Sequence, residues 1–210
     1  MLLYYITDRR ALAGTDAEQR AAVLCRVAEA ARAGVDYIQL REKDLAGREL
    51  ERLAREAVQA VRDNSGTTRL LINSRGDVAI ACGADGVHLA SGELAAPEVR
   101  ALWRKSAGGE PIIGVSAHSV ADVREAKAVG ADFAVLAPIF EKVETGSKGI
   151  GIEALREACG RESSFAVLAL GGVNLTNAGE CLQAGAAGVA GIRLFQTSNV
   201  AEIVRQLREV

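Results

Sequence analysis

The tetrapeptide Ala33-Gly34-Val35-Asp36 recurs in related form along the chain, and this repeat decides the fold. The related copies are Cys82-Gly83-Ala84-Asp85, Val129-Gly130-Ala131-Asp132 and Ala184-Gly185-Ala186-Ala187. The glycine of each copy can adopt the left-handed conformation that ends a helix, so a strand can start directly afterwards. The copies follow one another at intervals of about fifty residues, which is the length of two strand–helix units. Four copies therefore predict eight strands and eight helices.

Short apolar runs occur where this repeat requires strands. They span residues 2–7, 37–41, 70–73, 86–89, 112–116, 133–137, 166–171 and 188–192. Most of them are apolar without interruption, which is typical of parallel strands covered on both faces. We therefore predict the α/β class and a single (β/α)8 barrel of parallel strands, formed by one domain over residues 1–210. An open, doubly wound sheet is the alternative.

The segments between these runs have the spacing of helices. Thr15 and Glu18 form a capping box ahead of the first helix, which is expected to end at Gly34. A second apolar stripe begins at Leu50 and stops at Asn64. Further helices are predicted over residues 76–82, 95–105, 119–129, 152–159, 175–184 and 199–208.

The composition excludes several classes of protein. Hydrophobic residues make up 49% of the 210 residues and charged residues 25%, which is typical of a folded globular chain. The formal net charge is −2 and no Lys/Arg block occurs, so nucleic-acid binding is not expected. No apolar run is long enough to span a bilayer, and no secretion signal precedes the first strand. The four cysteines form no CxxC pair and are expected to be buried and reduced, which favours a cytoplasmic location.

Polar residues at the end of the second strand are the main candidates for ligand binding. The segment Tyr37-Ile38-Gln39-Leu40-Arg41-Glu42-Lys43 alternates polar and apolar residues up to Arg41. Because strand side chains alternate between faces, Gln39, Arg41 and Lys43 are expected to point into the mouth of the barrel. An amide, a guanidinium and an ammonium group there suit a phosphate or diphosphate. The alternative is a surface cluster in which these cations pair with Glu42 and Asp44.

Short motifs with chemical groups are distributed over the whole chain. They are Tyr4-Tyr5-Ile6-Thr7-Asp8, Gln39-Leu40-Arg41-Glu42-Lys43, Leu71-Ile72-Asn73-Ser74-Arg75-Gly76-Asp77, Gly83-Ala84-Asp85-Gly86-Val87-His88-Leu89, Ile113-Gly114-Val115-Ser116-Ala117-His118-Ser119, Ala137-Pro138-Ile139-Phe140 and Leu170-Gly171-Gly172-Val173. In this order they resemble the family of thiamine phosphate synthase and its relative TenI, a thiazole tautomerase. The resemblance implies the same barrel fold and a role in thiamine biosynthesis.

The resemblance implies an enzyme that couples hydroxymethylpyrimidine diphosphate with thiazole phosphate, giving thiamine phosphate and diphosphate. Mg2+ accompanies the diphosphate in this reaction. Carried over by position, the resemblance assigns substrate binding to Gln39, Arg41, Lys43, Asn73, Ser116, Gly172, Gly191, Ile192 and Arg193. In this assignment the first four residues, Gln39 to Asn73, would hold the diphosphate. Ser116 would contact the diphosphate or the pyrimidine. The last four, Gly172 to Arg193, would hold the thiazole phosphate. Ser116 is also a catalytic candidate.

Three segments depart from the family pattern. The metal-binding Asn-Asp pair is replaced by Asn73-Ser74, and a serine hydroxyl is a weaker ligand for a hard cation than a carboxylate. A second metal-binding aspartate is replaced by Glu93, which keeps a carboxylate on a longer side chain. The family's lysine-containing segment is replaced by residues 141–149, where Lys148 is the candidate catalytic lysine. The glycines and charges of that segment suit a mobile lid.

The tautomerase branch is the alternative activity. It also lacks the metal aspartates, carries a Ser-Gly pair at the position of Ser91-Gly92, and needs no metal cofactor. His118 is the acid/base candidate because imidazole titrates near neutrality, with a hydrogen-bonded structural role as the alternative. His88 is expected to be structural. A non-catalytic protein that binds a thiamine precursor is a third alternative, and relatives are often homodimers, so the resemblance also allows a homodimer.

Overall fold

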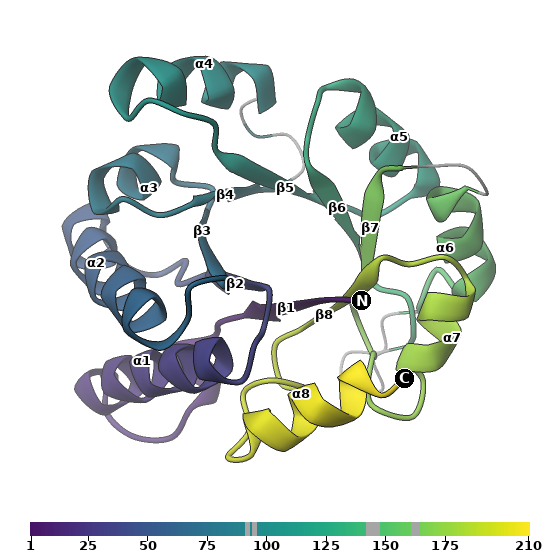
Figure 1. Ribbon diagram of the computed structural model, residues 1–210, viewed down its shortest axis with the longest axis horizontal. Helices are drawn as coiled ribbons and strands as arrows, with labels where there is room; N and C mark the ends of the chain where they lie inside the picture. Colours follow the sequence, from purple (N-terminus) through teal and green to yellow (C-terminus); the bar gives the residue numbers. More distant parts are fainter. Residues whose placement is uncertain (91–92, 94–95, 142–147, 161–163) are drawn as a thin grey trace.

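The computed structural model is a closed barrel of parallel strands with helices around its outside (Figure 1). It describes residues 1–90, 93, 96–141, 148–160 and 164–210. Consecutive strands are neighbours in the barrel, and the eighth pairs with the first to close the ring. This confirms the predicted (β/α)8 barrel and excludes the open, doubly wound sheet.

The elements follow the predicted order. The strands are β1 (Leu2–Ile6), β2 (Tyr37–Leu40), β3 (Arg69–Asn73), β4 (Gly86–Leu89), β5 (Ile112–Ala117), β6 (Phe133–Leu136), β7 (Ala166–Ala169) and β8 (Gly188–Gly191). The helices are α1 (Asp16–Arg32), α2 (Gly47–Asn64), α3 (Gly76–Cys82), α4 (Ala96–Ser106), α5 (Val120–Ala128), α6 (Ile152–Cys159), α7 (Ala178–Gln183) and α8 (Val200–Arg208). A 3-10 turn, η1 (Arg9–Ala11), follows β1. Every predicted strand end lies within two residues of the observed one.

The repeat forms the joints between helices and strands, as predicted. Its four glycines all have positive φ, between 70° at Gly83 and 100° at Gly185. The aspartates have a function that the sequence did not predict. The carboxylate of Asp36 accepts a hydrogen bond from the backbone N–H of Leu3 at 2.7 Å. Asp85 and Asp132 accept equivalent bonds from the backbone N–H groups of Leu70 in β3 and Ile113 in β5, at 2.8 and 2.7 Å.

The start of α7 differs from the prediction. The helix begins at Ala178, three residues after the predicted start at residue 175. Asn174 and Asn177 bond the intervening backbone instead: Asn174 Oδ1 accepts from the N–H of Thr176, and Asn177 Oδ1 accepts from the N–H of Asn174, both at 2.8 Å. These local bonds compete with helical hydrogen bonding and delay the helix.

Two apolar layers hold the barrel. The larger one lies between strands and helices and includes Ile38 and Leu40. The smaller one fills the barrel interior, where Tyr37 stacks on Phe133 with ring centroids 5.1 Å apart. The prediction of buried, reduced cysteines is wrong for Cys25, which is exposed on α1, and the other three are buried and free. Within the described residues, no helix combines the length and the apolar character that crossing a membrane requires.

Candidate active site

The inner end of the site is a pair of amides on β2 and β3. Gln39 is 1% exposed, and its Nε2 donates to Oδ1 of Asn73 at 3.1 Å. Asn73 in turn donates from Nδ2 to the hydroxyl of Ser74 at 2.8 Å. Ile38 and Leu40 face the outer apolar layer, so the predicted alternation along β2 holds up to Gln39.

Beyond Gln39, the chain leaves the strand. β2 ends at Leu40, so Arg41 and Lys43 lie on the loop that leads to α2. Arg41 is half-buried, its backbone N–H donates to the Thr7 hydroxyl at 3.0 Å, and its charge contributes to lowering the pKa of His88. Lys43 is exposed and lines a cavity at the carboxyl ends of β2, β3 and β4. The prediction that strand alternation alone positions all three side chains is therefore wrong for the last two.

This cavity gathers several of the predicted site residues. Its volume is about 350 Å3, and its lining residues are Leu40, Glu42, Lys43, Leu45, Leu50, Asn73, Ser74, Arg75, Ala90 and Glu93. Arg75 is paired with Asp77 at 2.6 Å. Lys43, Asn73 and Glu93 were predicted from the sequence, and the structure brings them to one cavity. Gln39, Arg41 and Ser116 are not part of its lining.

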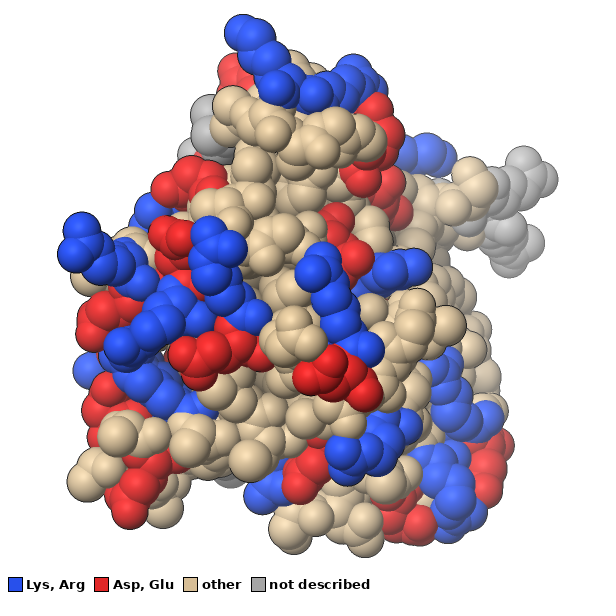
Figure 2. Space-filling model, turned by 60° about the vertical axis from the view of Figure 1, so that its left-hand side comes forward, with Lys and Arg blue, Asp and Glu red and all other residues tan. Residues whose placement is uncertain are grey.

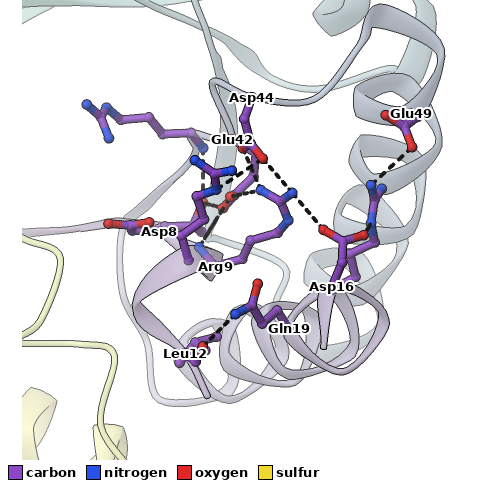
Figure 3. Close-up of polar contacts among 12 residues, drawn as sticks. Asp8, Arg9, Leu12, Asp16, Gln19, Glu42, Asp44 and Glu49 are labelled. Carbon is purple, nitrogen blue, oxygen red and sulfur yellow. Dashed lines mark hydrogen bonds and ion pairs between the residues drawn. The ribbon is translucent and has the colours of Figure 1, made fainter. Parts of the chain in front are cut away.

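The structure does not show the alternative arrangement, in which Arg41 and Lys43 pair with Glu42 and Asp44 in a surface cluster. Glu42 and Asp44 both pair with Arg9, at 3.3 and 2.6 Å (Figure 3). Within the described residues, neither Arg41 nor Lys43 forms an ion pair. Two cations at the mouth are thus left without a carboxylate partner there, and they are available to an anionic ligand.

His88, on β4, lies inside the barrel, and the charge of Arg41 acts on it. It is 3% exposed, and its ring bonds the Tyr4 hydroxyl through Nδ1 at 3.1 Å and the Ser116 hydroxyl through Nε2 at 3.0 Å. Burial, and secondarily the charge of Arg41, lowers its pKa to about 3, so the ring is neutral near pH 7. A Cβ on Gly114 would lie 2.8 Å from Nδ1, so the neighbouring strand needs glycine to admit the ring.

The hydrogen bonds of His88 also fix its tautomer. Tyr4 is completely buried, and among the described residues its hydroxyl has only Nδ1 as a partner. A buried O–H without an acceptor is costly, so Tyr4 donates to Nδ1. Nε2 then carries the proton and donates to Ser116 Oγ, which leaves the Ser116 hydroxyl hydrogen for another acceptor. His88 is structural, as predicted, and it also orients a predicted site residue.

His118 has the opposite environment. It is exposed on the loop after β5, and its Nδ1 donates to the carbonyl of Ala137 at 3.0 Å. A carbonyl can only accept, so the neutral ring carries its proton on Nδ1 and presents an unprotonated Nε2. The backbone N–H of His118 donates to Asp122 at 2.7 Å, which also holds the loop. His118 therefore has both features that the sequence allowed: a structural hydrogen bond and a nitrogen able to accept a proton.

Backbone groups dominate the side of the mouth formed by β7 and β8. Gly171 and Gly172 follow β7 with φ of 92° and 69°, and the carbonyl of Gly172 accepts from Asn177 Nδ2 at 3.0 Å. Among the described residues, no acceptor contacts the backbone N–H groups of Gly172 and Val173. Consecutive N–H groups in such a turn can bind an anion. Gly191 ends β8, next to Ile192.

The remaining predicted residues lie at the rim. Arg193 is exposed in the turn after β8. Lys148 is exposed two residues before Ile150, whose N–H donates to the carbonyl of Pro138 at 2.9 Å, so it lies on the mouth side of β6. Most of the predicted lid 141–149 and the Ser91-Gly92 pair are outside the described residues.

The expected metal position holds one carboxylate, that of the exposed Glu93, without a cationic partner among the described residues. Asn73 Oδ1 accepts from Gln39 and Ser74 Oγ accepts from Asn73, and each oxygen keeps a second lone pair. Glu93 Oε2 accepts from the N–H of Ala90 at 2.8 Å, and no group of three or more metal-ligating side chains occurs in the described part of the chain. Mg2+ is commonly held by one or two carboxylates plus substrate phosphates and water. The residues present therefore fit Mg2+ that a phosphorylated ligand helps to hold.

Comparison with known proteins now identifies the family. The sequence profile described as thiamine monophosphate synthase matches residues 3–195. The chain belongs to the thiamine monophosphate synthase family. A member, the thiamine-phosphate synthase of Moorella thermoacetica, is 40% identical over 183 residues, covering 84% of this chain and 82% of its own. The thiamine-phosphate synthase of Roseiflexus sp. is 37% identical over 191 residues, covering 90% of this chain and 75% of its own.

Solved structures agree with this family. The thiamine phosphate pyrophosphorylase of Pyrococcus furiosus matches with a TM-score of 0.81 at 30% identity, covering 99% of this chain and 94% of that one. A 3-hexulose-6-phosphate synthase matches at 18% identity and a TM-score of 0.69, which shows a shared fold alone.

Two residues near the site, Tyr4 and Arg9, were not predicted from the sequence. Tyr4 contacts His88, and strand alternation from the buried Tyr5 could have placed it inside the barrel. Arg9 holds Glu42 and Asp44, but it lies more than thirty residues away from both in the sequence, and no local pattern indicates that pairing.

Proposed function

We propose that this protein is a thiamine-phosphate synthase. It joins hydroxymethylpyrimidine diphosphate to thiazole phosphate and releases diphosphate, as the resemblance and the names of its relatives suggest. The observation that supports this most is the pair of cations, Arg41 and Lys43, that have no carboxylate partner within the described residues. Lys43 lines the cavity together with Asn73, whose amide bonds that of Gln39. A cytoplasmic location and a homodimer remain part of the prediction.

The reaction breaks the bond between the pyrimidine methylene carbon and the diphosphate oxygen. The electron pair leaves with diphosphate, a pyrimidine-methyl cation forms, and the thiazole nitrogen donates its pair to the carbon. In our proposal Arg41 and Lys43 stabilise the charge that develops on the leaving group. The apolar residues of the barrel interior exclude water from the cation beneath the mouth.

Ser116 and the glycines would position the reactants. The Ser116 hydroxyl hydrogen, left available by His88, would be donated to the diphosphate or the pyrimidine. The N–H groups beside Gly172, together with Gly191, Ile192 and Arg193, would hold the thiazole phosphate, and Lys148 would reach the mouth from the loop after β6. Glu93, with Ser74, would hold Mg2+, which supplies positive charge to the leaving diphosphate.

A metal-independent thiazole tautomerase is the second candidate. The tautomer of His118 favours it, because Nδ1 of the neutral ring bonds the Ala137 carbonyl and Nε2 can accept a proton from a bound thiazole carboxylate phosphate without a metal. The serine at position 74 is compatible with that activity as well.

One set of assays separates these functions. The protein is incubated with both synthase substrates, with Mg2+ or with a chelator, and separately with the thiazole carboxylate phosphate. We expect thiamine phosphate only with Mg2+, and its loss in Arg41→Ala. Tautomer conversion that survives the chelator and disappears in His118→Ala would instead establish the tautomerase. Tight binding of thiazole phosphate without either turnover would leave a non-catalytic binding protein.

A further inference from the structure

Arg9, in the turn η1 after β1, is an almost completely buried cation whose side chain bonds carboxylates and, within the described residues, none of the residues predicted to bind ligand. It is 3% exposed. Its guanidinium donates to Glu42 at 3.3 Å, to both oxygens of Asp44 at 2.6 and 2.8 Å, and to Asp16 at 2.8 Å (Figure 3). Its backbone N–H also donates to both oxygens of Glu42 at 3.2 Å. Arg9 therefore joins β1 to the loop that follows β2.

The carboxylates that Arg9 holds alternate with the cations of the site. Arg41, Glu42, Lys43 and Asp44 are consecutive in the chain. Opposite charges a few ångströms apart attract strongly where the solvent is partly excluded. Without another partner, Glu42 and Asp44 would neutralise the cations next to them. The pairing with Arg9 removes this competition, because both carboxylates are already bonded on the side of β1.

A second tie fixes the direction of the backbone. The Thr7 hydroxyl donates to Glu42 Oε1 at 2.6 Å and accepts from the backbone N–H of Arg41 at 3.0 Å. Glu42 is 4% exposed, so its carboxylate depends on Thr7 and Arg9 for hydrogen bonds. Asp44 also contacts Arg10 at 3.3 Å, but Arg10 is exposed, so the buried part of the network depends on Arg9.

We propose that Arg9 is a positioning residue for diphosphate: by holding Glu42 and Asp44 it keeps Arg41 and Lys43 free of carboxylates and available to the ligand. This inference rests on the proposed function, which assigns those two cations to the diphosphate. Arg9 acts through them and does not itself contact the ligand.

The test measures binding of inorganic diphosphate by titration calorimetry in a buffer with chelator, so that metals do not contribute. Arg9→Met releases the two carboxylates, and we expect the Kd to rise about tenfold or more. The triple variant Arg9→Met, Glu42→Gln, Asp44→Asn removes the competing charges as well, and we expect its Kd to return to within about threefold of the wild-type value.

A matched control is Arg100→Met. Arg100 is also largely buried and bridges two carboxylates, Glu110 and Asp132, but at the amino ends of β5 and β6, away from the mouth. It should lower stability without changing diphosphate affinity. If Arg9→Met does not fold, Thr7→Val cuts the other tie to Glu42 with little change in shape, and the Kd should rise about threefold or more.

Each result decides the proposal. Weaker diphosphate binding in Arg9→Met, together with near wild-type binding in the triple variant, supports the proposal. Unchanged affinity in Arg9→Met, or in Thr7→Val where that variant replaces it, overturns it. A triple variant that stays weak also overturns it, because Arg9 would then act directly or through the fold. A wild-type protein that binds no diphosphate, either with chelator or when the titration is repeated with Mg2+, refutes the diphosphate site itself, and with it the proposed function.

Discussion

The two halves of the barrel mouth offer anions different kinds of group. The half built on β1–β4 uses side chains: Arg41 and Lys43 on the loop after β2, and the paired amides of Gln39 and Asn73. The half built on β5–β8 relies mainly on backbone, with consecutive left-handed glycines after β7, and carries Arg193 and Lys148 at its rim. Figure 2 shows that basic and acidic side chains are mixed across the side that it presents. Because the formal net charge is also −2, no broad positive field is expected to attract anions. Anions at the mouth would therefore be bound by the individual groups of the site.

The difference shows two physical ways to make a phosphate site. A side-chain site needs cations whose neighbouring carboxylates are otherwise engaged, and Arg9 fulfils that condition. A backbone site needs a turn that only glycine adopts without strain, and its N–H groups carry no net charge. Anion binding by the first half should therefore be weakened by removing a charged side chain. Anion binding by the second half should be weakened by adding a side chain at a glycine.

The largest effect is expected on the glycine side. Gly172→Ala places a Cβ 2.7 Å from Phe140 Cβ in a residue with φ of 69°. Strain and crowding should together lower the free energy of unfolding by about 2–4 kcal/mol in urea titrations. Affinity for thiazole phosphate should fall, while affinity for diphosphate stays unchanged.

Gly108→Ala is the matched control for this change. Gly108 has nearly the same φ, 71°, and no atom lies within 4 Å of an added Cβ. It should lose only the strain energy, about 1–2 kcal/mol. Equal losses at both positions would contradict the crowding at Gly172.

On the cation side, Arg41→Ala tests side-chain charge. Losing one charge-assisted pair should weaken diphosphate binding by about 1.5–3 kcal/mol, measured by calorimetry. Thiazole phosphate binding should be unaffected. Arg55→Ala, an exposed arginine on α2 that pairs with Glu51, is the control and should leave both affinities unchanged. Unchanged diphosphate affinity in Arg41→Ala would refute the role of the loop after β2.

His88, on β4 at the border between the two halves, should make the stability of the protein depend on pH. His88 on β4 has a pKa of about 3 in the folded protein, well below that of an exposed histidine. Between these values the unfolded chain binds more protons, so stability rises with pH and is lost as the pH falls. The wild type should lose about 2 kcal/mol between pH 7 and pH 5 from this residue. In His88→Asn this loss should disappear from urea titrations; an identical loss in both proteins would argue against a buried, neutral ring.

The smallest effect comes from a single hydroxyl at the same border. Tyr4→Phe removes the donor to Nδ1 of His88, so we expect a loss of about 1 kcal/mol in stability and mixed tautomers in the imidazole nitrogen NMR spectrum. Tyr5→Phe is the control, because the adjacent Tyr5 hydroxyl is buried and has no partner among the described residues. Removing this unpartnered hydroxyl should neither lower stability nor change the tautomer of His88. A single unchanged tautomer in Tyr4→Phe would contradict the assignment.

The sequence predicted the barrel well because its signals are local. A capping box at Thr15 and glycines that end helices depend only on neighbouring residues, and all are confirmed. The runs between them could be placed to within two residues. The start of α7 was missed because Asn174 and Asn177 bond the backbone in a pattern that resembles an ordinary helix start in sequence.

The site was less accessible to sequence reasoning, since its geometry depends on distant residues. Gln39 and Asn73 could be placed from the alternation of two strands, and they are in contact. The alternative pairing of Arg41 and Lys43 could not be settled, because the answer lies with Arg9 on another loop. The bond from His88 to Ser116 likewise joins two strands whose register the sequence does not specify.

The missing aspartate of the repeat has a consequence for ring closure. Its fourth copy ends in Ala187, so no carboxylate secures that joint, and β7 and β8 share only two paired positions, where every other neighbouring pair of strands shares three or four. Local opening of the barrel should therefore be easiest between these two strands. Gly172 follows β7, and Gly191 is the last residue of β8. A phosphate held by both would span this gap, so occupancy by the thiazole substrate would tighten the barrel where it is least secured.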